Sequence, residues 1–184
     1  MNIPNLLSLS RLPLAVVLFV CIHNEAWLFG LVVFAIAGVT DWADGYLARR
    51  WNQQTAVGRS LDPLTDKVLL NGAFIFFIPV VSAGIAPWMA TVVIARELLI
   101  TGIRGMVEAT GAKFAADWFG KLKTILQFAV IIALLLLLTL QSYGTLSEVW
   151  PAMDAIYRGL LWAMLIATVG SGLQYVWKAW KVLK

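Results

Sequence analysis

The chain has 184 residues, of which 61% are hydrophobic and 13% are charged, and this composition excludes an ordinary soluble domain. The net charge of +4 does not indicate a nucleic-acid partner, because the basic residues are spaced between apolar segments and not clustered with aromatic side chains. The single cysteine, Cys21, excludes an intramolecular disulfide and a cysteine-based zinc site. We therefore expect one all-α integral membrane domain over residues 1–184, with membrane lipids and phosphorylated substrates as its partners.

Six apolar segments, each near the length of a membrane-spanning helix, follow one another along the chain. They are predicted at residues 5–22, 27–50, 63–82, 87–108, 118–140 and 156–180. Lys and Arg gather after the second and fourth segments and at the C-terminus, whereas the other connections contain neither. By the positive-inside rule, both termini and the two basic connections lie in the cytoplasm. The sequence thus predicts a multi-pass bundle of six helices in the inner (cytoplasmic) membrane.

Four aspartates lie close together in the sequence, around the connection between the second and third segments: Asp41, Asp44, Asp62 and Asp66. A carboxylate that directly follows an apolar helix is costly unless it is paired, so such residues usually face a protein interior or a watery cavity. On a helix, the first two aspartates share a face with Gly45 and Ala48, which have little or no side chain. Asp62 precedes Pro63, a favourable first helical residue, and we expect Asp62 to cap the third helix. These features predict a polar cavity that faces the cytoplasm.

Four carboxylates without His or Cys ligands form a set of hard oxygen donors, which suits Mg²⁺ or Mn²⁺ better than zinc or copper. Two such ions would balance the four charges and would clamp the attacking and leaving oxygens of a phosphoryl displacement. We therefore expect two divalent ions at these aspartates. The alternative is a structural one, in which the aspartates pair with nearby basic residues at the membrane interface: Arg49, Arg50, Arg59 and Lys67.

The aspartates belong to a longer pattern. It reads Asp41-Trp-Ala-Asp44-Gly45-Tyr-Leu-Ala48-Arg49, then eight residues, then Gly58-xxx-Asp62-xxx-Asp66. This pattern resembles the whole signature of the CDP-alcohol phosphotransferase family, with eight fixed identities over 26 residues. The N-terminal segment, residues 2–11, is similar to the first helix of that family. The resemblance extends over nearly the full chain and implies a homodimer.

The resemblance also implies roles for these residues. Asp41, Asp44 and Asp62 would hold the metal ions, and Asp66 would lie near the second ion and act as the general base. Gly45 and Ala48 match positions whose missing bulk admits the cytidine nucleotide, and Arg49 and Gly58 would border its diphosphate. Three polar residues recur every third position on the first segment and form a stripe that faces the same cavity or, alternatively, caps the helix at the interface: Asn5, Ser8 and Arg11.

Basic residues of the later segments are candidates for binding a second substrate. Arg96 and Arg104 lie eight residues apart, on one face of an apolar helix, and buried arginines need an anionic partner. For Arg96 the alternative partner is its neighbour Glu97, whereas the phosphate of a substrate would satisfy Arg104 together with Lys121 or Lys123. Both arrangements are compatible with each other. We therefore predict an acceptor-phosphate site at Arg96, Arg104, Lys121 and Lys123.

The identity of the acceptor follows from further resemblance. Residues 40–53, 61–68, 94–97 and 120–124 resemble bacterial members of the family that use glycerol 3-phosphate. This implies that the phosphatidyl group of CDP-diacylglycerol is transferred to glycerol 3-phosphate with release of CMP. The alternatives are a related synthase that takes an inositol phosphate or phosphatidylglycerol and, outside the family, an ion or phosphate transporter. The transporter is disfavoured because every acid of the motif lies toward the cytoplasmic side.

Overall fold

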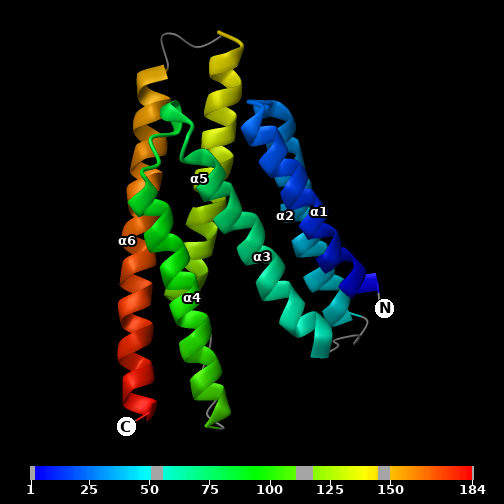
Figure 1. Ribbon diagram of the computed structural model, residues 1–184, viewed down its shortest axis with the longest axis vertical. Helices are drawn as coiled ribbons and strands as arrows, with labels where there is room; N and C mark the ends of the chain where they lie inside the picture. The colour runs from blue at the N-terminus through cyan, green and yellow to red at the C-terminus, as the bar shows by residue number, and fades with distance from the viewer. Residues whose placement is uncertain (1–2, 51–55, 111–117, 145–149, 184) are drawn as a thin grey trace. The chain divides into compact units, whose positions relative to one another are not determined.

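The computed structural model describes residues 3–50, 56–110, 118–144 and 150–183, which form α-helices joined by short connections, without strands (Figure 1). The helices are α1 (Ile3–His23), α2 (Trp27–Arg50), α3 (Ala56–Phe77), α4 (Pro87–Ala109), α5 (Trp118–Ser142) and α6 (Trp150–Leu183), with a 3-10 turn, η1 (Val81–Ala83), before α4. The all-α prediction is therefore confirmed for this part of the chain. Each of the six predicted segments overlaps one of these helices.

The chain divides into two compact units. Unit 1 contains α1, α2, α3 and the second part of α5, from Ile131 onward. Unit 2 contains α4, α6 and the first part of α5, which ends at Val130. Each unit holds one group of the residues that the sequence singled out, because the aspartates lie on α2 and α3 and the acceptor-site candidates lie on α4 and α5.

In unit 1, α1 packs against both α2 and α3. Apolar side chains buried between these helices include Leu18 of α1, Phe34 of α2 and Phe74 of α3. The Phe19 ring stacks on Phe76 with a centroid distance of 4.8 Å. Phe19 also lies directly over Gly72, where an added Cβ would come within 2.1 Å of the ring. The absence of a side chain at position 72 therefore allows α1 and α3 to approach closely.

The predicted boundaries of the third helix were wrong. The helix begins at Ala56, not Pro63, so Asp62 lies within the helix and does not cap it. Pro63 removes one helical hydrogen bond, but transmembrane helices tolerate such a loss where neighbouring groups compensate for it. The helix ends at Phe77, not Ser82, because Pro79 disfavours a helical conformation of the residue before it and cannot donate a backbone hydrogen bond.

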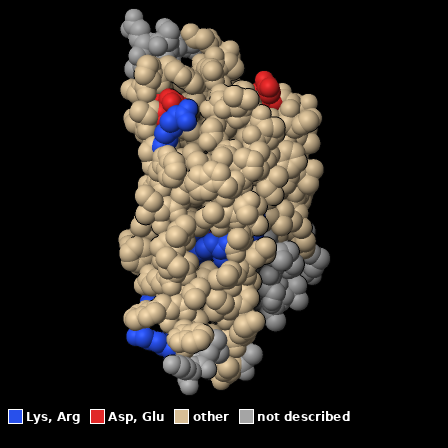
Figure 2. Space-filling view, turned by 60° about the vertical axis from the view of Figure 1, so that its left-hand side comes forward, with Lys and Arg blue, Asp and Glu red and all other residues tan. Residues whose placement is uncertain are grey.

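The surface carries many large apolar side chains. Phe29, Ile166 and Leu173 are each about 70% exposed, and the face drawn in Figure 2 consists mainly of uncharged residues. Among the described residues, two helical stretches are long and apolar enough to cross a membrane, Trp118–Ser142 and Trp150–Lys181. Shorter apolar helical stretches occur at Leu9–His23, Trp27–Asp41 and Lys67–Phe77. These surfaces support membrane association, since an exposed apolar area of this extent is unfavourable in water.

Candidate active site

The four aspartates lie in two pairs on two helices of unit 1. One pair lies near the C-terminal end of α2, with Asp44 one turn after Asp41, and the other lies on α3, with Asp66 one turn after Asp62. Both helices pack against α1. Asp41 is the member whose side chain is described, and the described side chains contain no group of three or more His, Cys, Asp or Glu that would hold a metal ion.

Asp41 forms an ion pair with Arg11 across the contact between α1 and α2. Arg11 Nη1 donates to Asp41 Oδ1 at 2.6 Å. The Arg11 side chain is fully buried, whereas that of Asp41 is 40% exposed. A guanidinium group removed from water needs an anion, and Asp41 supplies one. Arg11, which was predicted to bind the nucleotide, therefore contacts Asp41, which was predicted to bind metal.

The remaining predicted residues of this site lie on the same three helices, and their side chains are outside the described residues: Asn5, Ser8, Asp44, Gly45, Ala48, Arg49, Gly58, Asp62 and Asp66. The helical geometry of α2 puts Asp41, Asp44, Gly45 and Ala48 on one face, because they follow the i, i+3, i+4, i+7 spacing. These four positions therefore lie on the same side of the α2 backbone.

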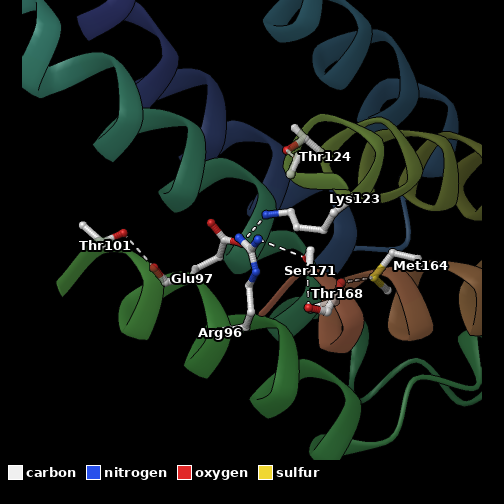
Figure 3. A network of polar contacts seen from close by, with 9 residues as sticks. Arg96, Glu97, Thr101, Lys123, Thr124, Met164, Thr168 and Ser171 are labelled. Atoms are coloured by element: carbon white, nitrogen blue, oxygen red, sulfur yellow. Dashed lines mark hydrogen bonds and ion pairs between the residues drawn. The ribbon is translucent and has the colours of Figure 1, made fainter. Parts of the chain in front are cut away.

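A cluster of charged and polar side chains lies inside unit 2 (Figure 3). The Glu97 carboxylate on α4 accepts hydrogen bonds from Arg96 Nη1 at 3.2 Å and from Lys123 Nζ on α5. Lys123 and Glu97 are buried, with 4% and 8% of their surfaces exposed. The pairing of Arg96 with Glu97, which the sequence offered as the alternative to phosphate binding, is thus present in the structure. The contact between Glu97 and Lys123 is a further finding, which links α4 to α5.

Arg96 also connects α4 to α6. Its Nη2 donates to Ser171 Oγ at 3.0 Å, and Ser171 Oγ in turn donates to the Thr168 carbonyl at 3.0 Å (Figure 3). The α6 backbone approaches closely here, because a Cβ on Gly172 would lie 3.2 Å from Arg96 Cγ. The Nε atom of Arg96 is buried and has no hydrogen-bond partner among the described residues. Arg96 is thus engaged by protein groups on two of its three nitrogens.

Arg104 lies two turns beyond Arg96 on α4 and is exposed. Its Nε donates to Tyr175 Oη on α6 at 3.2 Å, and its guanidinium carbon lies 5.8 Å from the centre of the Tyr175 ring. Lys121 is exposed on α5, while Lys123, two residues later, is buried. Residues two positions apart on a helix do not face each other. The four predicted acceptor-site residues therefore differ in their exposure to solvent. Arg104 and Lys121 are exposed, whereas Arg96 and Lys123 belong to the buried cluster around Glu97.

Sequence reasoning missed two residues of this region, Ser171 and Tyr175, and one contact, that of Glu97 with Lys123. Ser171 and Tyr175 lie one turn apart on α6, in a segment that carries no recognised motif. A weak signal was available for the Glu97 contact, because Lys123 begins an apolar run and a cation there needs a buried anion. Nothing in the sequence indicated that α4, α5 and α6 meet at these positions.

Comparison with known proteins agrees with the signature. The sequence model described as CDP-alcohol phosphatidyltransferase matches residues 1–171. A protein of Bacillus subtilis is 36% identical over 199 aligned residues, which cover 100% of this chain and 97% of that protein. A protein of Haemophilus influenzae is 33% identical, covering 95% of this chain and 91% of that protein.

A third relative, from Escherichia coli K12, is 37% identical, and its alignment covers 73% of this chain and 76% of that protein. All three relatives are named CDP-diacylglycerol–glycerol-3-phosphate 3-phosphatidyltransferase. The family match and the full-length relatives agree with the complete aspartate signature on α2 and α3. The chain therefore belongs to the CDP-alcohol phosphatidyltransferase family.

Proposed function

We propose that this protein is a phosphatidylglycerophosphate synthase, which transfers the phosphatidyl group of CDP-diacylglycerol to glycerol 3-phosphate and releases CMP. The observation that carries the proposal is the 36% identity with a B. subtilis protein of that name over the whole chain. The complete signature from Asp41 to Asp66 supports the same chemistry, and the buried cationic cluster of unit 2 supports a phosphorylated acceptor.

The family depends on divalent metal ions, and the donor set fits such ions. Four carboxylates offer only hard oxygen ligands, and the Asp41 carboxylate is 40% exposed, with Oδ1 bonded to Arg11. We propose that Mg²⁺ or Mn²⁺ is bound as two ions by Asp41, Asp44, Asp62 and Asp66. When bound, the ions neutralise charge on the diphosphate and on the attacking oxygen.

The residues of the chain supply binding and proton transfer. The acceptor hydroxyl oxygen attacks the lipid-bearing phosphorus, the bond from that phosphorus to CMP breaks, and Asp66 accepts the hydroxyl proton. We propose that the nucleotide is bound by residues of α1, α2 and α3, namely Asn5, Ser8, Arg11, Gly45, Ala48, Arg49 and Gly58. The acceptor phosphate is bound by Arg104, Lys121 and Lys123, with Arg96 beside them.

We also propose that all six helices span the inner membrane, with both termini in the cytoplasm, and that the protein is a homodimer. The exposed apolar side chains and the two long apolar helical stretches support a membrane setting. The distribution of Lys and Arg among the connections supports the orientation.

The proposed function is tested by identifying the lipid product. Purified protein is incubated with labelled CDP-diacylglycerol, a divalent cation and one acceptor at a time: glycerol 3-phosphate, an inositol phosphate, phosphatidylglycerol or serine. We expect phosphatidylglycerophosphate from glycerol 3-phosphate and little product from the others. A product formed only with another acceptor would replace the proposed acceptor, and the absence of any product under all conditions would contradict the enzymatic function.

A further inference from the structure

Glu97 lies at the centre of the buried cluster in unit 2, where α4, α5 and α6 meet (Figure 3). Its Oε1 atom accepts hydrogen bonds from two cations, Arg96 and Lys123. A buried ion pair contributes little net stability compared with apolar residues of similar volume, because the cost of desolvation offsets the attraction. The stability of the fold therefore does not explain why three charged side chains are buried here. A role in ligand binding explains their presence better.

The two cations of the cluster differ in their freedom to move. Arg96 is held by Glu97 at Nη1, by Ser171 at Nη2 and by the close approach of Gly172 to its side chain. Lys123 carries a compact ammonium group at the end of a flexible four-carbon chain, whose rotamer entropy is large unless a contact restricts it. The ion pair with Glu97 is one of the contacts that restrict it. Glu97 therefore contributes to the position of the Lys123 ammonium group.

The cluster is also suited to an anion by charge. Two cations and one carboxylate leave a formal charge of +1. A phosphate monoester carries nearly two negative charges at pH 7, so this excess attracts it. An ammonium group has three N–H donors, so a lysine can contact a carboxylate and a phosphate oxygen at the same time. Restricting the lysine beforehand lowers the entropy that is lost when it binds a phosphate oxygen.

We infer that Glu97 is a positioning residue for the acceptor phosphate: it holds the Lys123 ammonium group in place on α5 and thereby lowers the KM for glycerol 3-phosphate. This inference rests on the proposed function, in which Lys123 binds that phosphate. A carboxylate also repels a phosphate, so a Glu97 that only neutralised Lys123 would weaken acceptor binding. Positioning and neutralisation therefore predict opposite changes in KM when Glu97 is replaced.

The test is steady-state kinetics of the purified enzyme, with each substrate varied in turn. Glu97→Ala removes both contacts and should raise the KM for glycerol 3-phosphate about tenfold, while the KM for CDP-diacylglycerol changes less than about twofold. Glu97→Gln keeps an oxygen that accepts from Lys123 and should raise the same KM only about two- to fivefold. Asp154→Asn is the matched control, because it removes a carboxylate paired with Arg158 at 2.7 Å in the same unit without touching the cluster. Its KM values should equal those of the wild type.

An unchanged KM for glycerol 3-phosphate in Glu97→Ala would overturn the inference, and so would a lowered KM in Glu97→Gln. A loss of thermal stability and of active enzyme with both KM values unchanged would show a purely structural role and would also overturn it. If Glu97→Ala does not fold, the inference is tested with Glu97→Gln alone. A KM for glycerol 3-phosphate above that of the wild type then supports the inference. A wild-type enzyme that does not use glycerol 3-phosphate would refute the proposed function and this inference together, whereas one whose KM is insensitive to Glu97 would refute the inference alone.

Discussion

At the scale of single residues, the charge buried between α1 and α2 has a measurable consequence. Arg11 is fully buried and bonded to Asp41 at 2.6 Å, so the two residues should be coupled in stability. We expect a double-mutant cycle of Arg11→Met and Asp41→Asn to give a coupling free energy of about 1–3 kcal/mol. Unfolding is measured in detergent with excess EDTA, so that bound metal does not contribute.

The pair of Asp154, which is partly buried, and Arg158, which is exposed, provides the control for this cycle. The Arg158 side chain is 54% exposed, and the two residues are one helical turn apart on α6. Such pairs contribute about 0.3–0.5 kcal/mol because solvent screens them. A coupling between Arg11 and Asp41 no larger than this would show that their contact does not stabilise the packing of α1 on α2.

Arg104 offers a second test at the scale of residues. If it binds the acceptor phosphate, Arg104→Ala should raise the KM for glycerol 3-phosphate about tenfold or more, because a hydrogen bond to a charged group contributes about 1.5–3 kcal/mol. Tyr175→Phe removes the oxygen that Arg104 Nε contacts but keeps the ring, and it should raise the same KM about two- to fivefold. An Arg104→Ala enzyme with the acceptor dependence of the wild type would remove this residue from the site.

At the scale of elements, the contact between α1 and α3 depends on a missing side chain. A Cβ at position 72 would lie 2.1 Å from the Phe19 ring, which is itself stacked on Phe76. Gly72→Ala should therefore destabilise the protein by about 1–3 kcal/mol, seen as a lower thermal midpoint. Gly102→Ala is the control, because a Cβ there meets nothing within 4 Å. Equal midpoints for the two variants would contradict the close approach of α1 and α3.

The positions of the helices were largely predictable, because long apolar segments bounded by polar connections are typical of membrane-type helices. The predicted and observed starts of α2, α4 and α5 coincide. The prediction was wrong at α3, where Pro63 indicated a helix start although the helix begins at Ala56. It also placed the start of α6 six residues too late, at residue 156 instead of Trp150. Local signals of this kind are weak, and the tertiary context can override them.

The candidate site was predictable to the extent that it follows a linear pattern. The aspartates on α2 and α3 form such a pattern, and so does the neighbouring pair Arg96 and Glu97. The contact of Glu97 with Lys123 joins residues 26 positions apart, and that of Arg104 with Tyr175 joins residues 71 positions apart. These contacts depend on the rotation of one helix about its axis relative to another. Side-chain packing determines that rotation, and no single segment of the sequence encodes it.

At the scale of the whole molecule, activity should depend on a divalent cation. The four aspartates repel one another unless cations neutralise them, and the phosphates of both substrates add negative charge. Excess EDTA should abolish product formation, and addition of Mg²⁺ or Mn²⁺ should restore it. Full turnover in excess EDTA would contradict the proposed metal site. The Asp154→Asn variant should show the same cation dependence as the wild type, since that carboxylate is paired with Arg158.

The reaction of the whole enzyme should be a direct displacement that requires both substrates at once. Carboxylates that coordinate metal are poor nucleophiles, so a covalent phosphatidyl-enzyme is disfavoured and Asp66 is better suited to act as a base. We expect Asp66→Asn to lose nearly all turnover while CDP-diacylglycerol still binds. The wild type should not exchange labelled CMP into CDP-diacylglycerol without glycerol 3-phosphate, and a single in-line step should invert the configuration at phosphorus. Rapid CMP exchange without the acceptor, or retention of configuration, would instead establish a covalent intermediate and require an aspartate to be the nucleophile.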